Sequence, residues 1–187
     1  GMDVDLPRHS HLAKVFPPPQ NQHGVRARPQ ARLVGLVGLW DGICYAFRWT
    51  SLQVGEQFSA RKLLGFLRAG DLLLCDRNFP DKATFAGVLA KGADFLFHWP
   101  SSRFLKLPRL PVAHGHRDEW YVRIPLPTEL AEQYPALGGT LQVRILQYQL
   151  PGFRPSWLVT SLLDAQEFAY QELVKLYHER WRQETFH

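Results

Sequence analysis

The chain has 187 residues, of which 45% are hydrophobic, 13% are aromatic and 21% are charged, and its formal net charge is +5. This length and apolar content exclude a disordered chain and suffice for a domain with its own core. No apolar run approaches the roughly 18 residues that span a bilayer, and no secretory signal is visible, so we expect a cytoplasmic protein. The two cysteines, Cys44 and Cys75, lie in apolar stretches and are predicted to be buried thiols.

The first half of the chain alternates predicted strands and helices. Residues 31–40 and 43–50 predict two strands, and Asp41-Gly42 between them is typical of a two-residue hairpin turn. The patterns that follow predict a helix over 57–68, a strand over 71–75, a helix over 82–90 and a strand over 93–99. This order favours an α/β fold with a mixed sheet and flanking helices, and we expect the hairpin to join that sheet.

After residue 99 the chain becomes rich in predicted strands. Residues 120–125, 140–149 and 157–163 predict strands separated by turns, and a last helix is predicted from about residue 169 to the end. The sequence therefore predicts three segments: the first part of an α/β core over 1–99, a β-rich insertion over 100–155, and a returning strand and helix over 156–187.

Two segments are basic and broken by prolines. Residues 1–35 and 100–117 carry an excess of lysine and arginine, and the second has no acidic residue. Such segments suit phosphate contacts along a nucleic acid, but basic loops are also common simply because water solvates them well. His114 and His116 lack a third ligand nearby, which favours a solvent-exposed loop over a metal site.

The last helix places charged residues on its apolar face. At 100° per residue, Arg180 and Glu184 fall in the arc that Leu173 and Tyr177 also occupy. Charges on a core-facing stripe are costly unless they are paired, bind a metal or line a cleft. A local Arg180–Glu184 salt bridge is the simpler interpretation, and a functional site is the alternative.

Asp76 ends the apolar run of residues 72–75, at the carboxyl end of a predicted buried strand. Ligands and catalytic groups of open α/β sheets gather at such ends, although an aspartate here could also cap the turn that follows. Asp76 on a strand end and Glu184 on a facing helix are the oxygen ligands that Mg²⁺ prefers, and a pair of such ions supports phosphoryl transfer.

These residues resemble a known family. Tyr177, Arg180 and Glu184 match the Y-x2-R-x3-E core of the YREK signature of DDE transposases of the insertion-sequence-four type, and CDRNF around Asp76 resembles the block with their second catalytic aspartate. Further similarity covers Leu6-Pro7, PQARLV at 29–34, LPGF at 150–153 and LVTSLLD at 158–164.

The resemblance implies a ribonuclease H-like core interrupted by a β-strand domain, and metal-dependent DNA cleavage and strand transfer in cut-and-paste transposition. It assigns Asp76 and Glu184 as catalytic ligands of Mg²⁺ or Mn²⁺, and Tyr177 and Arg180 as DNA-binding residues. It further implies double-stranded DNA, both transposon ends and target, as partner, a homodimer on paired ends, no membrane, and a bacterial, nucleoid-associated location in the cytoplasm.

The match also predicts a chain truncated at both ends. The family's first aspartate would lie just before Gly1, and the lysine of the signature would lie beyond His187. Asp3 and Asp5 are nearby but out of register with that first aspartate. We therefore expect a fragment that is inactive alone, whose two-metal site needs the missing carboxylate.

Three other interpretations remain open at this point. The chain could be a catalytically dead DNA-binding remnant of a transposase, or another ribonuclease H-like nuclease. It could also be a structural module in which Arg180 and Glu184 form an ion pair and Asp76 is a turn cap.

Overall fold

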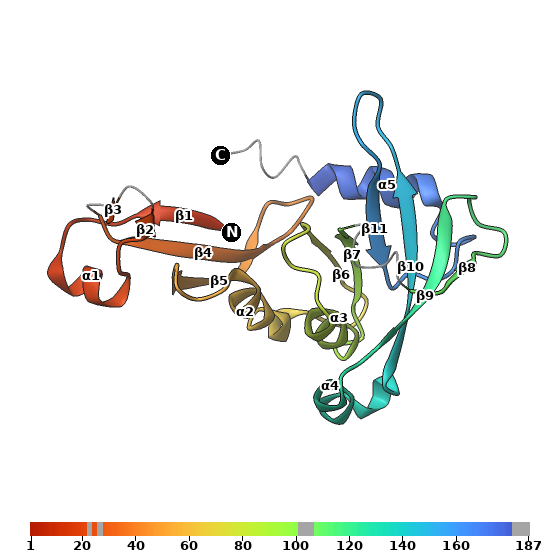
Figure 1. The fold of residues 1–187 in the computed structure, drawn as a ribbon, viewed down its shortest axis with the longest axis horizontal. Coiled ribbons are helices and arrows are strands. Elements are labelled where there is room, and N and C mark those ends of the chain that lie inside the picture. The colour runs from red at the N-terminus through yellow and green to blue at the C-terminus, as the bar shows by residue number, and fades with distance from the viewer. Residues whose placement is uncertain (22–23, 26–27, 101–106, 181–187) are drawn as a thin grey trace. The chain divides into compact units, whose positions relative to one another are not determined.

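The computed structural model describes residues 1–21, 24–25, 28–100 and 107–180, and the chain divides into two compact units, Gly1–Phe66 and Leu67–His187 (Figure 1). The predicted segment boundaries near residues 99 and 155 do not coincide with this division. The reason is that each of the three predicted segments of the chain contributes strands to one and the same sheet of the second unit.

The first unit is built on a three-stranded antiparallel sheet in the order β1-β4-β5, formed by β1 (Met2–Asp5), β4 (Gln30–Val37) and β5 (Cys44–Ser51). The other elements of this unit are α1 (Ser10–Val15), the short strands β2 (Gln20–Asn21) and β3 (Gly24–Val25), α2 (Glu56–Arg61) and the 3-10 helix η1 (Leu64–Phe66). A small core joins Val34, Ala46 and Leu63. The prediction that this hairpin joins the larger sheet is wrong, because it forms a sheet of its own.

The predicted two-residue turn is also wrong. Residues 38–43 all lie between β4 and β5, and a register shift occurs at Leu36/Val37. The Asp41 side chain explains the wider loop, because it accepts hydrogen bonds from the Ile43 amide (2.9 Å) and the Tyr45 hydroxyl (2.7 Å).

The second unit contains a six-stranded mixed sheet in the order β6-β7-β11-β10-β9-β8. Its strands are β6 (Leu72–Cys75), β7 (Asp94–His98), β8 (Arg109–Pro111), β9 (Glu119–Pro125), β10 (Thr140–Tyr148) and β11 (Ser156–Thr160). Its helices are α3 (Lys82–Leu89), α4 (Thr128–Gln133), the 3-10 helix η3 (Pro135–Leu137) and α5 (Tyr170–Glu179). Only β6 and β7 pair in parallel; the other neighbours are antiparallel. The predicted α/β class, with a mixed sheet and flanking helices, is confirmed.

Helices cover both faces of this sheet beside β7. Phe85 of α3 stacks on Phe95 at a ring-centre distance of 4.6 Å, while Leu173 and Tyr177 of α5 share a core cluster with Leu96. Alternate residues of β7 thus face different helices, as strand geometry requires. Fully burying one such side chain contributes about 1.5–3 kcal/mol, so these contacts fix both helices on the sheet. Within the described residues, no helix is long and apolar enough to cross a bilayer.

Candidate functional site

Asp76 follows β6 directly and is half-buried. Because β6 and β7 are parallel neighbours, their carboxyl ends lie at the same edge of the sheet, where ligands of α/β sheets gather. Asp76 Oδ1 accepts a hydrogen bond from the Arg77 amide (2.6 Å), and its carbonyl accepts one from the Phe79 amide (3.1 Å). These two hydrogen bonds support the interpretation of Asp76 as a cap of the turn that follows β6.

His98 is the neighbour that sequence reasoning missed. It ends β7, and the register that pairs Cys75 with Phe97 places His98 level with Asp76. Burial lowers the pKa of His98, and the nearby Asp76 charge partly opposes that shift, so Asp76 lies close enough to act on the imidazole. The sequence did contain a signal for His98. Two strands were expected to run in parallel, and Asp76 follows the first while His98 ends the second.

Tyr177 reaches the same edge from α5. Its side chain is 2% exposed, and its ring centre lies 6.3 Å from that of His98. Burial raises the pKa of the Tyr177 hydroxyl, the Arg180 charge partly opposes this and the Asp76 charge adds to it, so the phenol stays neutral over the physiological range. A neutral phenol can donate and accept hydrogen bonds but is a poor nucleophile, which fits a binding role.

Arg180 caps the carboxyl end of α5 and is half-buried. Its guanidinium carbon lies 5.4 Å from the centre of the Tyr177 ring, and its charge also acts on His98. Three of the four predicted site residues, Asp76, Tyr177 and Arg180, are therefore brought together from segments about a hundred residues apart in the sequence. The fourth, Glu184, lies outside the described residues.

The donor set of this cluster partly fits a magnesium or manganese ion. Mg²⁺ is commonly held by one or two carboxylates and keeps several waters, and the half-exposed Asp76 is such a ligand. No group of three His, Cys, Asp or Glu suitable for a metal occurs among the described residues. Two-ion chemistry requires further carboxylates, and the predicted one, Glu184, lies outside the described residues.

Other predicted residues lie elsewhere. Asp3 forms a two-pronged ion pair with Arg32 (2.7 and 3.0 Å), whose hydrogen bonds lower the pKa of the Asp3 carboxyl, and Asp5 binds the Gln30 side chain at 2.5 Å. Both aspartates belong to the first unit and have structural partners there. The prediction of buried thiols is wrong for Cys44, which is exposed, and Cys75 is half-buried.

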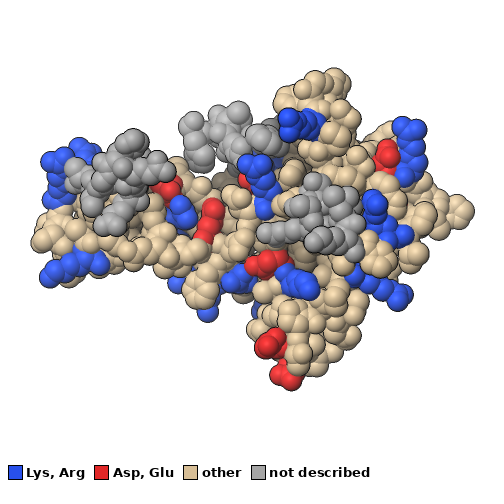
Figure 2. Space-filling model, in the orientation of Figure 1, with Lys and Arg blue, Asp and Glu red and all other residues tan. Residues whose placement is uncertain are grey.

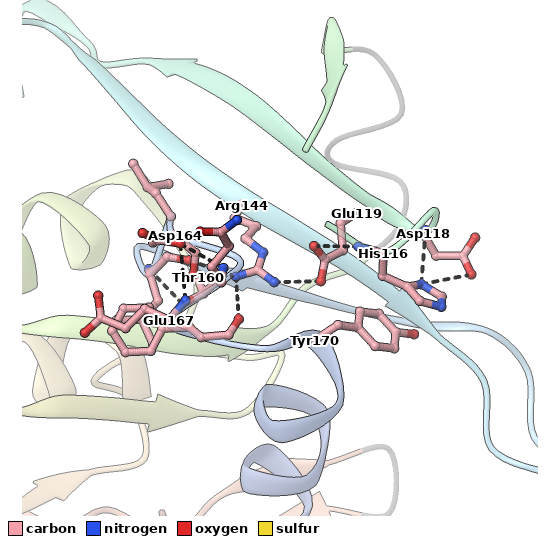
Figure 3. A network of polar contacts seen from close by, with 12 residues as sticks. His116, Asp118, Glu119, Arg144, Thr160, Asp164, Glu167 and Tyr170 are labelled. Carbon is pink, nitrogen blue, oxygen red and sulfur yellow. Dashed lines mark hydrogen bonds and ion pairs between the residues drawn. The ribbon is translucent and has the colours of Figure 1, made fainter. Parts of the chain in front are cut away.

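A buried ion pair was not anticipated. Arg144 on β10 and Glu119 on β9 are 0% and 1% exposed, and the Arg144 Nη2–Glu119 Oε1 distance is 2.6 Å. Figure 3 shows the Arg144 guanidinium between Glu119 and the loop that leads to α5. The alternation of β10 could have predicted that Arg144 is buried, because Arg144 shares a strand face with Leu146 and Tyr148, which are both buried.

On the face drawn in Figure 2, Lys and Arg side chains predominate over Asp and Glu side chains. By sequence, the first unit has eight Lys and Arg against four Asp and Glu, so most of the net charge of +5 belongs to it. No protein-family model matches the chain, and no curated protein matches its sequence.

Proposed function

We propose that the chain is part of the catalytic domain of a DDE transposase of the insertion-sequence-four type, a DNA-cleaving and DNA-joining enzyme. One observation carries the proposal: the His98 and Tyr177 rings lie 6.3 Å apart at the carboxyl edge of β6 and β7, and the charges of Asp76 and Arg180 act on both of them. The carboxyl edge of parallel strands is where α/β sheets bind ligands, which favours a functional site over a structural module.

Each residue has a chemical role in this proposal. Asp76 and Glu184 hold Mg²⁺ or Mn²⁺, which, when bound, supplies Lewis-acid stabilisation of the transferring phosphoryl group. Arg180 contacts a DNA phosphate, because its planar guanidinium matches phosphate oxygens and stays charged. Tyr177 packs under the guanidinium and restricts where it can point.

The fold is compatible with this function at a coarse level. An antiparallel meander, β1-β4-β5, precedes a parallel strand–helix–strand unit, β6-α3-β7, and helices cover both faces beside β7. This order of elements fits a ribonuclease H-like core, although the meander forms a sheet of its own, and β8–β10 lie where the family carries a β-strand insertion. The net positive charge suits a double-stranded DNA partner, and the dimer on paired transposon ends is implied by the family resemblance alone.

The test is metal binding followed by DNA cleavage. Mn²⁺ should broaden the NMR signals of His98 and Tyr177 in the wild-type chain and in the control Glu132→Gln on the exposed side of α4. The Asp76→Asn variant should lose this broadening. It should also abolish any Mg²⁺-dependent nicking of supercoiled plasmid by the chain or by the complete reading frame that encodes it.

Two results would contradict the proposal. Broadening that is the same in Asp76→Asn argues against a metal at this edge, and nicking that survives the substitution argues against its role in cleavage. DNA binding that is indifferent to chelator and to Asp76→Asn favours the catalytically dead remnant. Preference for branched or damaged DNA favours another ribonuclease H-like nuclease.

A further inference from the structure

Arg144 and Glu119 form a charged pair in the interior of the second unit. They lie on neighbouring strands, where Leu146 is the direct partner of Glu119 and Arg144 is its diagonal neighbour. Glu119 Oε2 also accepts a hydrogen bond from the His116 amide (3.3 Å), and a Cβ at Gly115 would approach that oxygen to 2.6 Å. The chain around Glu119 is therefore shaped to hold this carboxylate inside.

The other arm of Arg144 binds the loop between β11 and α5. Nη1 donates to the carbonyls of Phe168 (2.7 Å), Asp164 (3.4 Å) and Leu162 (3.5 Å) (Figure 3). The Tyr121 hydroxyl donates to the carbonyl of Leu163 in the same loop (2.8 Å). Side chains of β9 and β10 thus hold a loop that has no regular structure of its own.

The first residue of α5 is tied to the same strands. The Tyr170 hydroxyl donates to the Gln147 carbonyl of β10 (2.6 Å), and its ring stacks on His116 at 4.2 Å. Ala169, which precedes α5, supplies no side-chain cap. The start of α5 is therefore fixed by bonds to the sheet rather than by a cap within the helix.

Stability alone does not explain a buried pair of this kind. Replacing a buried ion pair with apolar side chains of similar volume is often neutral or stabilising, because both charges must be dehydrated. The loop carbonyls, however, need a donor in the interior, and apolar replacements cannot supply one. The pair therefore supplies loop contacts that apolar side chains could not, beside the Tyr121 bond to Leu163 and the loop's own bonds to the Asp164 side chain.

We propose that Arg144, oriented by Glu119, is a positioning residue: it fixes the loop of residues 162–168 and the start of α5, and so holds Tyr177 and Arg180 opposite Asp76 and His98. Arg180 lies ten residues beyond Tyr170, which is about 15 Å along the helix axis. A tilt of about 10° at the start of α5 would move Arg180 by about 2.5 Å, and displacements near 1 Å already cost on the order of 100-fold in catalytic rate. The expected effect on DNA cleavage rests on the proposed function. The role of Arg144 in positioning α5 does not.

The decisive variant replaces both partners, Arg144→Met with Glu119→Leu, so that no unpaired charge remains. Its urea midpoint should lie close to that of the wild type, because relief from dehydrating two charges offsets the lost loop bonds, and amide exchange in β9 and β10 should be unchanged. Amides of residues 162–168 should exchange about tenfold faster, because the carbonyl contacts are gone. The NMR contact between the His98 and Tyr177 rings should weaken.

A second variant and a control keep the test sharp if the double variant folds poorly. Arg144→Lys keeps the charge but offers one ammonium in place of a two-armed guanidinium, so it should loosen the loop while leaving the sheet intact. Arg123→Met removes an exposed arginine of β9 and should match the wild type in every readout.

The outcome that would overturn the inference is a loop and a His98–Tyr177 contact that stay as in the wild type in both Arg144 variants. In a cleaving chain, the double variant should lower kcat on the order of 10- to 100-fold with little change in DNA affinity, which a general loss of folded protein would not produce. If the geometric result holds but the wild-type chain neither binds Mn²⁺ nor cleaves DNA, the proposed function fails and the positioning role stands.

Discussion

Tyr177 combines near-complete burial with a charged neighbour. Its ring packs in the core cluster of the second unit while the Arg180 guanidinium lies 5.4 Å from its centre. The ring therefore serves both packing and the orientation of Arg180, and the two contributions separate in suitable variants.

Tyr177→Ala should lower the free energy of unfolding by about 3–5 kcal/mol, because it leaves a cavity between α5 and the sheet. Tyr177→Phe keeps the ring and should cost much less, with the hydroxyl contribution alone lost. Urea unfolding followed by circular dichroism measures both values. Equal losses in the two variants would show that the hydroxyl, not the packing, carries the stability.

The His98 imidazole reports on its charged neighbours. Asp76 raises its pKa, whereas burial, Arg77 and Arg180 lower it. Asp76→Asn should therefore lower the His98 pKa further, and Arg180→Met should raise it, in a metal-free buffer with chelator. An NMR titration of His98 measures both shifts, and Glu132→Gln serves as the control. A His98 pKa that stays the same in both variants would show that neither Asp76 nor Arg180 acts on His98. It would contradict the grouping of these residues in one site.

Patterns in the sequence predicted the residues with a local signal. Asp76 ends an apolar run, and Tyr177 and Arg180 fall on one helix face. His98 and Arg144 could not be predicted in this way, because their roles depend on partners that are distant in the sequence. His98 needs the β6–β7 register, and Arg144 needs the carbonyls of a loop some twenty residues further along the chain.

At the scale of elements, apolar runs and alternations located most strands, including the four-residue β6, whereas short helices were predicted poorly. β6, α3, β7, β9, β10 and β11 lie where the patterns placed them. The helix predicted over 57–68 is shorter, because α2 ends at Arg61 and the chain continues as a 3-10 turn that contains Gly65, a poor helix former. The short helices α1 and α4 carry too few turns to show a helical period.

α3 depends on a cap that lies just after the candidate site. Asp81 Oδ1 accepts a hydrogen bond from the Thr84 amide at 2.6 Å, as an N-cap should. Asp81→Ala should cost about 1 kcal/mol in unfolding free energy, and Asp81→Asn should recover most of it, because asparagine caps equally well. Urea midpoints measure the difference. An alanine variant as stable as the wild type would show that α3 is held by its aromatic contacts alone.

At the scale of the whole molecule, most of the net positive charge lies in the first unit. Arg8 and Arg28 there are exposed. If DNA contacts this unit, Arg8→Glu with Arg28→Glu should weaken duplex binding and reduce the slope of log affinity against log salt by up to about 2. Arg123→Glu with Arg154→Glu, two exposed sites in the second unit, is the matched control. Fluorescence anisotropy across a potassium chloride series measures both slopes, and equal slopes for the two variants would contradict a DNA-binding role of the first unit.

The division of the chain into two units was not predictable from strand order alone. The hairpin and the later strands carry the same apolar texture, so nothing local says that β4 and β5 stay apart from β6. Pairing between strands is decided by contacts across the sheet rather than by the propensity of each strand.

The two cysteines are the feature with the most direct experimental use. The exposed Cys44 belongs to the first unit, and the half-buried Cys75 belongs to the second, directly before Asp76. A maleimide reagent should therefore label Cys44 first, since access controls thiol reactivity. With Cys44 blocked, a spin label at Cys75 would sit one residue from the candidate metal ligand. The native protein thus offers one reporter for each unit without any substitution.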